Sequence, residues 1–248
     1  MIETMQRDPF PRAIPARRGA AWISEGFEFF KEDALSWIGA SLLFFIISLA
    51  VSVVPILGSL AVYFLTTLFF GGLMLGCHAR QQGGEFSVNH LFAGFSQNTP
   101  QLLILGGIYL AGNIIIIILV IVSILFLPGG GMGVLEKIAS NDPVLIREML
   151  AFVSLVVLIA LALYLPLIMA MWFAPALVML QDVSAVRAMQ LSFMACLLNI
   201  VPYLIYGILA LVLMILAAIP FGLGFLVLFP VITASIYAAW REIFQPAA

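Results

Sequence analysis

Charged residues are scarce in this sequence, where they make up 9% of 248 residues against about 25% in ordinary soluble domains. A soluble globular protein is excluded because so little charge cannot cover its surface. The chain also lacks an excess of basic residues, since its formal net charge is −2, so nucleic acid is not expected as a partner. Disorder is excluded because 64% of the residues are hydrophobic. This abundance of apolar residues indicates a polytopic membrane protein.

Long stretches without charge locate the membrane spans, because charged side chains rarely face hydrocarbon. One span takes about 20 residues, so the charge-free stretches 34–79 and 188–240 are each long enough for two. Pro and Gly interrupt both stretches, at Pro55–Gly58 and Pro220–Gly224, where we expect tight reversals. The sequence therefore predicts an all-α protein with six transmembrane helices, near 37–54, 57–77, 101–127, 150–180, 200–219 and 223–240.

Prolines and glycines mark irregular backbone around the fourth span. Pro166 and Pro175 are expected to kink this span, because proline removes a helical hydrogen bond. Before it, the glycine-rich run 129–133 predicts a flexible turn. Asp142 and Pro143 then have the residue types of a helix N-cap and first helical position.

Lysine and arginine are distributed unevenly over this six-span arrangement. Eight of the ten fall on one side of the membrane, and only Lys137 and Arg147 fall on the other. The positive-inside rule therefore predicts that both termini are cytoplasmic. We expect residues 1–20 to form a flexible cytoplasmic tail, and residues 21–245 to form a single six-helix transmembrane domain.

Three short segments before membrane spans have an apolar stripe at helical spacing. Each is too short to cross about 30 Å of hydrocarbon, so we predict three amphipathic helices on the cytoplasmic membrane surface. We expect their large apolar side chains to be shielded and the glutamates of the first segment to face solvent. The segments are 22–32, 87–96 and 184–196, the apolar residues Phe27, Phe30, Phe92, Phe95, Met189 and Phe193, and the glutamates Glu25, Glu28 and Glu32.

The same three segments suggest an internal repeat. Each reaches a small polar residue, Asp33, Asn98 or Asn199, immediately before the chain enters the membrane. A unit of surface helix, span, turn and span would then occur three times. Amphipathic connectors that resemble one another only in composition are the alternative.

Several stretches resemble an uncharacterised family of bacterial six-span inner-membrane proteins. They are LSWIGASLLFFIISLAVSVVPILGSL after Gly26, LMLGCHA, HLFAGF, LSFMACLLN and PFGLGFLVLFPVITASIYAAWREIF. The resemblance implies a six-span topology and supplies no chemistry, because the family has no established activity. The chain is more loosely similar to the membrane domain found beside some glycerophosphodiester phosphodiesterases, but we do not expect their catalytic domain here.

Few residues within the predicted spans are candidates for a functional site. Asn113 is a strongly polar residue deep in a span, and we interpret it as a hydrogen-bonding contact to a neighbouring helix. Contact with a substrate, or a backbone contact of no consequence, are the alternatives. Small residues at spacing four, which are Gly72 with Gly76 and Gly107 with Ala111, predict close helix packing rather than a pore.

Motifs for catalysis or metal binding are missing from the sequence. Neither G-x-S-x-G nor H-E-x-x-H occurs, and the glycine-rich run lacks the Lys-Ser or Lys-Thr of a phosphate-binding loop. His78 and His90 lack the further ligands that a zinc site needs, and Cys77 and Cys196 are expected to pack as small apolar residues. We therefore expect no catalytic, cofactor or metal site, and no enzyme.

Two functions are compatible with these features. The favoured one is a non-enzymatic membrane component that acts through contacts with membrane lipids, other membrane proteins or a second copy of itself. The alternative is a transporter or permease for an apolar or lipid-like small molecule, because spans broken by proline can expose backbone groups to a binding cavity.

Overall fold

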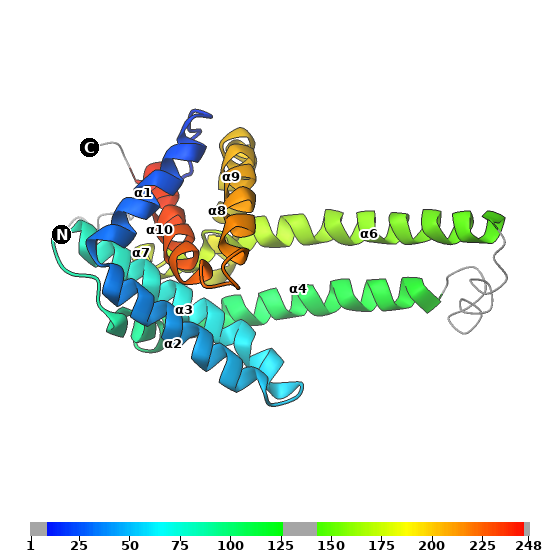
Figure 1. Cartoon of the computed structure of the whole chain (residues 1–248), viewed down its shortest axis with the longest axis horizontal. Helices are drawn as coiled ribbons and strands as arrows, with labels where there is room; N and C mark the ends of the chain where they lie inside the picture. The colour runs from blue at the N-terminus through cyan, green and yellow to red at the C-terminus, as the bar shows by residue number, and fades with distance from the viewer. Residues whose placement is uncertain (1–8, 126–142, 246–248) are drawn as a thin grey trace, which may run out of the picture. The chain divides into compact units, whose positions relative to one another are not determined.

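The computed structural model describes residues 9–125 and 143–245, and within these residues the regular structure is entirely helical. Six helical stretches are long and apolar enough to cross a membrane, which confirms the predicted all-α, six-span fold (Figure 1). In chain order the helices are α1 (Arg18–Glu32), α2 (Ala34–Ser52), α3 (Leu57–Gln81), the 3₁₀ helix η1 (Val88–Phe95), α4 (Thr99–Leu125), α6 (Pro143–Met171), α7 (Ala174–Gln181), α8 (Ala185–Leu198), α9 (Ile200–Ala218) and α10 (Phe225–Phe244).

The chain divides into two compact units, whereas the sequence predicts a single domain over residues 21–245. One unit, called the bundle below, comprises Met1–Gly107 and Met169–Ala248. The other, called the hairpin unit, comprises Ile108–Ile168 and contains most of α4 and α6.

Both reversals predicted from proline and glycine are confirmed. The first lies between Ser52 at the end of α2 and Leu57 at the start of α3. The second lies between Ala218 at the end of α9 and Phe225 at the start of α10. The observed spans begin and end within a few residues of their predicted limits, except in the fourth span.

The two prolines that are expected to kink the fourth span occupy different helical positions. Pro166 lies inside α6, which continues to Met171, and the helix is interrupted only at Trp172 and Phe173. Pro175 follows as the second residue of α7, a position where its missing N–H group costs no helical hydrogen bond. Pro143 is the first residue of α6 as predicted, while Asp142 and the run 129–133 lie outside the described residues.

Helices occupy all three of the predicted surface segments, where α1, η1 and α8 are found. The second is a 3₁₀ helix, and Ser87 is its N-cap. The Ser87 hydroxyl accepts from the backbone N–H of Asn89, and the ring of His90 accepts in return from the backbone N–H of Ser87. These two bonds satisfy donors that the first turn of the helix leaves without an intrahelical partner.

The predicted apolar side of α1 is buried against the protein only in part. Gly19, Trp22, Gly26 and Phe30 are buried, whereas Phe27 is 43% exposed. A pattern of apolar side chains does not identify glycine as a buried residue. The two glycines nevertheless allow the backbone of α1 to approach its neighbours closely. A Cβ atom on Gly26 would lie 2.4 Å from the carbonyl oxygen of Val231 in α10.

In the other two surface helices the predicted apolar side chains are likewise buried against the protein only in part. In η1, Phe92 and Phe95 are 40% and 44% exposed. In α8, Met189 and Phe193 are half-buried. The buried residues of these helices are therefore mainly small residues and leucines, such as Gly94, Leu191 and Ala195.

Candidate functional site

Three polar residues connect the short helices to the spans that follow them, and we call Asp33, Asn98 and Asn199 the junction residues. Asp33 and Asn199 share one backbone conformation, with φ and ψ of −132° and 41° in the former and −120° and 33° in the latter. Asn98 has a φ of 52°, in the left-handed region that asparagine tolerates better than most residues. All three therefore bend the chain between a short helix and a membrane span.

Asp33, between α1 and α2, binds the segment that leads into η1. Its Oδ2 atom accepts a hydrogen bond from the backbone N–H of Phe86 over 3.3 Å. The same oxygen lies 3.0 Å from Nε of Arg80, near the end of α3. The aromatic ring of Phe86 stacks on Trp37 with centroids 3.8 Å apart, which fixes this segment against α2.

Asn98, between η1 and α4, binds the segment that leads into α8. Its Nδ2 atom donates to the carbonyl oxygen of Val178 over 2.9 Å and to Oδ1 of Asp182 over 2.7 Å. Asp182 follows α7 directly and has a left-handed φ of 53°. Three residues after Asn98, in the first turn of α4, Oε1 of Gln101 accepts a hydrogen bond from the backbone N–H of Ala185 over 2.8 Å.

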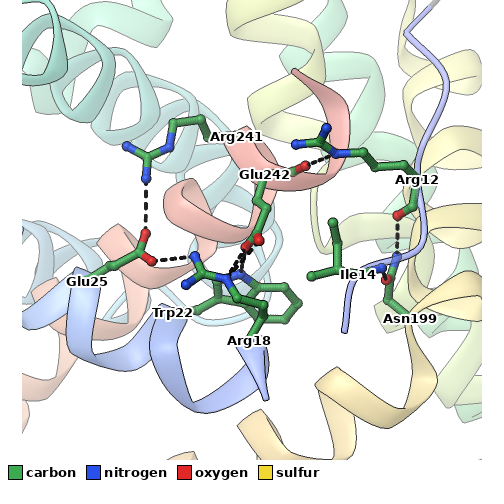
Figure 2. Close-up of polar contacts among 8 residues, drawn as sticks. All are labelled: Arg12, Ile14, Arg18, Trp22, Glu25, Asn199, Arg241 and Glu242. Carbon is green, nitrogen blue, oxygen red and sulfur yellow. Dashed lines mark hydrogen bonds and ion pairs between the residues drawn. The ribbon is translucent and has the colours of Figure 1, made fainter. Parts of the chain in front are cut away.

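Asn199, between α8 and α9, binds the N-terminal segment that leads into α1 (Figure 2). Its Oδ1 atom accepts from the backbone N–H of Ile14 over 2.7 Å. Its Nδ2 atom donates to the carbonyl oxygens of Arg12 over 3.0 Å and Ala195 over 2.9 Å. Asn199 is completely buried, so these bonds replace all of its contact with solvent.

These contacts form a closed cycle of three repeats, namely α1–α3, η1–α7 and α8–α10. Each junction residue binds the segment that enters the next repeat, and the third binds the segment that enters the first. The short helices follow the same order, because η1 contacts α3, α8 contacts α7 and α1 contacts α10. This pattern favours a genuine repeat over connectors that share only their composition.

The described part of the N-terminal segment, from residue 9 on, differs from the flexible tail that is predicted for residues 1–20. Arg12 donates its backbone N–H to the carbonyl oxygen of Ile243 over 3.1 Å, and its Nε to that of Glu242 over 2.5 Å. Ile14 is held by Asn199, and α1 already begins at Arg18. Residues 12–14 therefore take the place of the connection that the other two repeats receive from the preceding span.

An ionic cluster joins α1 to the end of α10 (Figure 2). Glu242 accepts from Nε of Arg18 over 2.7 Å and from Nε1 of Trp22 over 2.7 Å. Glu25 lies 2.5 Å from Arg18 and 3.0 Å from Arg241. Desolvation would lower the pKa of Arg18, but hydrogen bonds to Glu242 and Glu25 outweigh it and raise this pKa above its ordinary value. Glu25 is thus part of a structural ion pair, which corrects the prediction that it faces open solvent.

A polar cleft of about 330 Å³ lies beside this cluster, between α1, the end of α3 and α10. Its lining comprises Glu25, Glu28, Phe29, Glu32, Arg80, Gln81 and Arg241. Tyr237 donates a hydrogen bond to Gln81, and its hydroxyl lies 3.1 Å from Nδ1 of His78. The charges of the cleft are largely paired with one another, as in Arg80 with Glu32.

Among the described residues, the hydrogen bond of Asn113 stays within α4 rather than reaching a neighbouring helix. Its Nδ2 atom donates to the carbonyl oxygen of Tyr109, one turn earlier in α4, over 2.8 Å. The polar contact between α4 and α6 lies at that turn, where the hydroxyls of Tyr109 and Tyr164 are 3.3 Å apart. Asn113 itself is half-buried and lines an open groove between these two helices.

The small residues singled out in the sequence lie in different surroundings. A Cβ atom on Gly72 would lie 2.2 Å from the carbonyl oxygen of His90, and one on Gly76 would lie 2.6 Å from the ring of Phe86. This pair therefore faces the segment of η1 rather than another span. Gly107 has only an ordinary contact, 3.7 Å from a Cβ atom to the ring of Phe64, and Ala111 is exposed.

The sequence singles out the three junction residues but not their partners. Most of these partners are backbone groups, such as the N–H of Ile14 for Asn199 across 185 positions. The ionic cluster is equally hidden, because Glu242 is visible after an apolar span but one sequence cannot tell that it meets Arg18, 224 positions away. Cys77 and Cys196 are both buried thiols, in agreement with the prediction that they pack as small apolar residues.

Six apolar spans, with the ionic groups of the bundle at helix ends, define a multi-pass integral membrane protein. The chain is 30% identical over 234 residues to a probable inner membrane protein of Burkholderia thailandensis. The aligned residues cover 91% of this chain and 82% of the relative. The chain therefore belongs to the family of this inner membrane protein. No family model and no solved structure matches it, and the relative provides no link to the phosphodiesterases that the sequence loosely resembles.

Proposed function

We propose that the protein is a non-enzymatic component of the inner membrane that acts through contacts with lipids and partner proteins. The observation that carries this proposal is the apolar surface of the hairpin unit. The most apolar windows of its two spans contain no buried residue. Exposed aliphatic side chains cover both helices, among them Ile115, Ile118, Leu158 and Leu161. A surface of this kind is stable only against acyl chains or another apolar protein surface.

The interruption of the fourth span supports this proposal over transport. A transporter commonly uses unwound backbone groups to bind its substrate. At Phe173, however, the backbone N–H donates to Oγ of Ser192 over 2.9 Å. The same hydroxyl donates to the carbonyl oxygen of Met169 over 2.7 Å. These two backbone groups are therefore bound by a buried side chain of α8, rather than directed towards a ligand.

Reconstitution distinguishes this proposal from the competing function, a permease for an apolar or lipid-like molecule. We expect liposomes that contain the full chain to move a fluorescent phospholipid between leaflets no faster than protein-free liposomes. The measurement is the fraction of the label that dithionite can reduce from outside. Faster movement that is lost in Asn113→Ala would contradict the proposal, because this variant removes a polar group within the hairpin unit.

Both termini are proposed to be cytoplasmic, which places the junction residues on the cytoplasmic side of the membrane. We expect reporter fusions at Ala248 and within Gly83–Gly84 to report the cytoplasm, and one near Ser140 to report the opposite side. The physical reason is the eight-to-two distribution of lysine and arginine. A cytoplasmic signal from the fusion near Ser140 would overturn this orientation.

A further inference from the structure

An open groove runs between α4 and α6 in the hairpin unit. Its volume is about 330 Å³, and its lining comprises Asn113, Ile116, Ile117, Val157, Ala160, Leu161 and Tyr164. Ile117 and Leu161 are each more than half exposed at its edges. The short side chain of Ala160 leaves room for an inserted side chain. The groove is thus an apolar surface with one carboxamide in it.

This carboxamide lies near the middle of a membrane span. Asn113 is 14 residues after Thr99 and 12 before Leu125, which are the ends of α4. At a rise of about 1.5 Å per residue it is roughly 20 Å from either end, and so lies within about 30 Å of hydrocarbon. Its Nδ2 atom has one hydrogen bond, to Tyr109. Oδ1 and the second hydrogen of Nδ2 have no hydrogen bond to any described residue, and water is scarce at this depth.

A lipid cannot supply the missing partners. Acyl chains contain neither donors nor acceptors, and the polar groups of a phospholipid lie at the edge of the hydrocarbon layer. A second carboxamide can supply both, because each one carries a donor and an acceptor. In two copies with the same orientation in the membrane, Asn113 lies at the same depth, so a twofold axis allows the side chains to bond reciprocally.

We propose that the groove binds the hairpin unit of a second copy, with Asn113 of each chain hydrogen-bonded to the other. This inference rests on the proposed function, since it names one of the partner proteins. Aliphatic residues at the groove edges pack against the second copy and remove water and lipid from the two amides. The carboxamide fixes the register of the contact, as buried polar groups do between membrane helices.

Association in liposomes tests the hydrogen bonds. Full chains labelled at the C-terminus with donor or acceptor fluorophores should show energy transfer that increases with the protein-to-lipid ratio. Asn113→Leu should weaken association about five- to tenfold, because two interhelical bonds of about 0.6 kcal/mol are lost. Asn113→Gln, which keeps the carboxamide, should retain most of it. Ser123→Ala is the matched control, since this hydroxyl on the same helix bonds only within it, to Leu119. If Asn113→Leu associates as strongly as the natural chain, or if Ser123→Ala weakens association equally, the inference is overturned.

Cross-linking tests the surface. Ile117 lines the groove and Ile115 does not, although the two are 53% and 59% exposed on the same helix. Because Cys77 and Cys196 are buried, they give little background. Mild oxidation should link Ile117→Cys into dimers and leave Ile115→Cys mainly monomeric, while equal yields contradict the inference. If the protein is a monomer and does not move phospholipid, the inference of a second copy is overturned and the proposed function stands. If it moves phospholipid in a way that depends on Asn113, the proposed function is overturned.

Discussion

Gly72→Ala is expected to destabilise the protein by about 3 kcal/mol, the upper part of the range for an overpacked core. The added methyl group would lie 2.2 Å from the carbonyl oxygen of His90 and 2.8 Å from that of Leu91. Both oxygens belong to the backbone of η1, so no change of rotamer can relieve the contact. On the opposite side of the same contact, Gly94 of η1 approaches the carbonyl oxygen of Leu68 in α3. Thermal unfolding in nanodiscs measures the loss.

Gly207→Ala is the matched control for this prediction. Gly207 also lies within a membrane span, α9, and a Cβ atom there would have no neighbour within 4 Å. Alanine is the better helix former by about 1 kcal/mol, so this variant should be at least as stable as the natural chain. Equal destabilisation by both substitutions would show that η1 does not pack on Gly72.

Asn199→Ala is expected to cost about 1–3 kcal/mol of stability, because three hydrogen bonds of a fully buried side chain are lost. The effect should be largest in the N-terminal segment, since Ile14 loses its hydrogen-bond acceptor there. Asn89→Ala provides the control, because Asn89 is exposed on η1 and a surface substitution of this kind changes stability by about 0.5 kcal/mol or less. If Asn89→Ala loses stability and Asn199→Ala does not, the role assigned to Asn199 is contradicted.

The six spans could be predicted because hydrocarbon excludes charge, and this constraint acts on each stretch of sequence separately. The predicted span 200–219 agrees with α9 at Ile200–Ala218 for that reason. The fourth span was less predictable because the effect of a proline depends on its position. Pro175 lies at a helix start, where it is tolerated, and the actual interruption at Trp172 and Phe173 is stabilised by the distant Ser192.

The junction residues could be predicted as positions, but their contacts could not. Polar residues before a span are visible in the sequence, whereas the segments they bind are up to 187 positions away. The buried side of α1 was predicted only in part, for a related reason. Its packing depends on Gly19 and Gly26, whose value is the close approach they permit and not any hydrophobicity of their own. Contacts between distant segments and backbone approach are therefore what one sequence leaves undetermined.

The cycle of three repeats closed by the N-terminal segment is tested most directly by amide hydrogen exchange in the full chain. The backbone N–H groups of Arg12 and Ile14 are bonded to Ile243 and Asn199, respectively. We therefore predict slow exchange at both amides in the natural chain, and faster exchange at Ile14 in Asn199→Ala. Exchange at the rate of an unstructured peptide over residues 12–14 of the natural chain would contradict the closed cycle and support the predicted flexible tail.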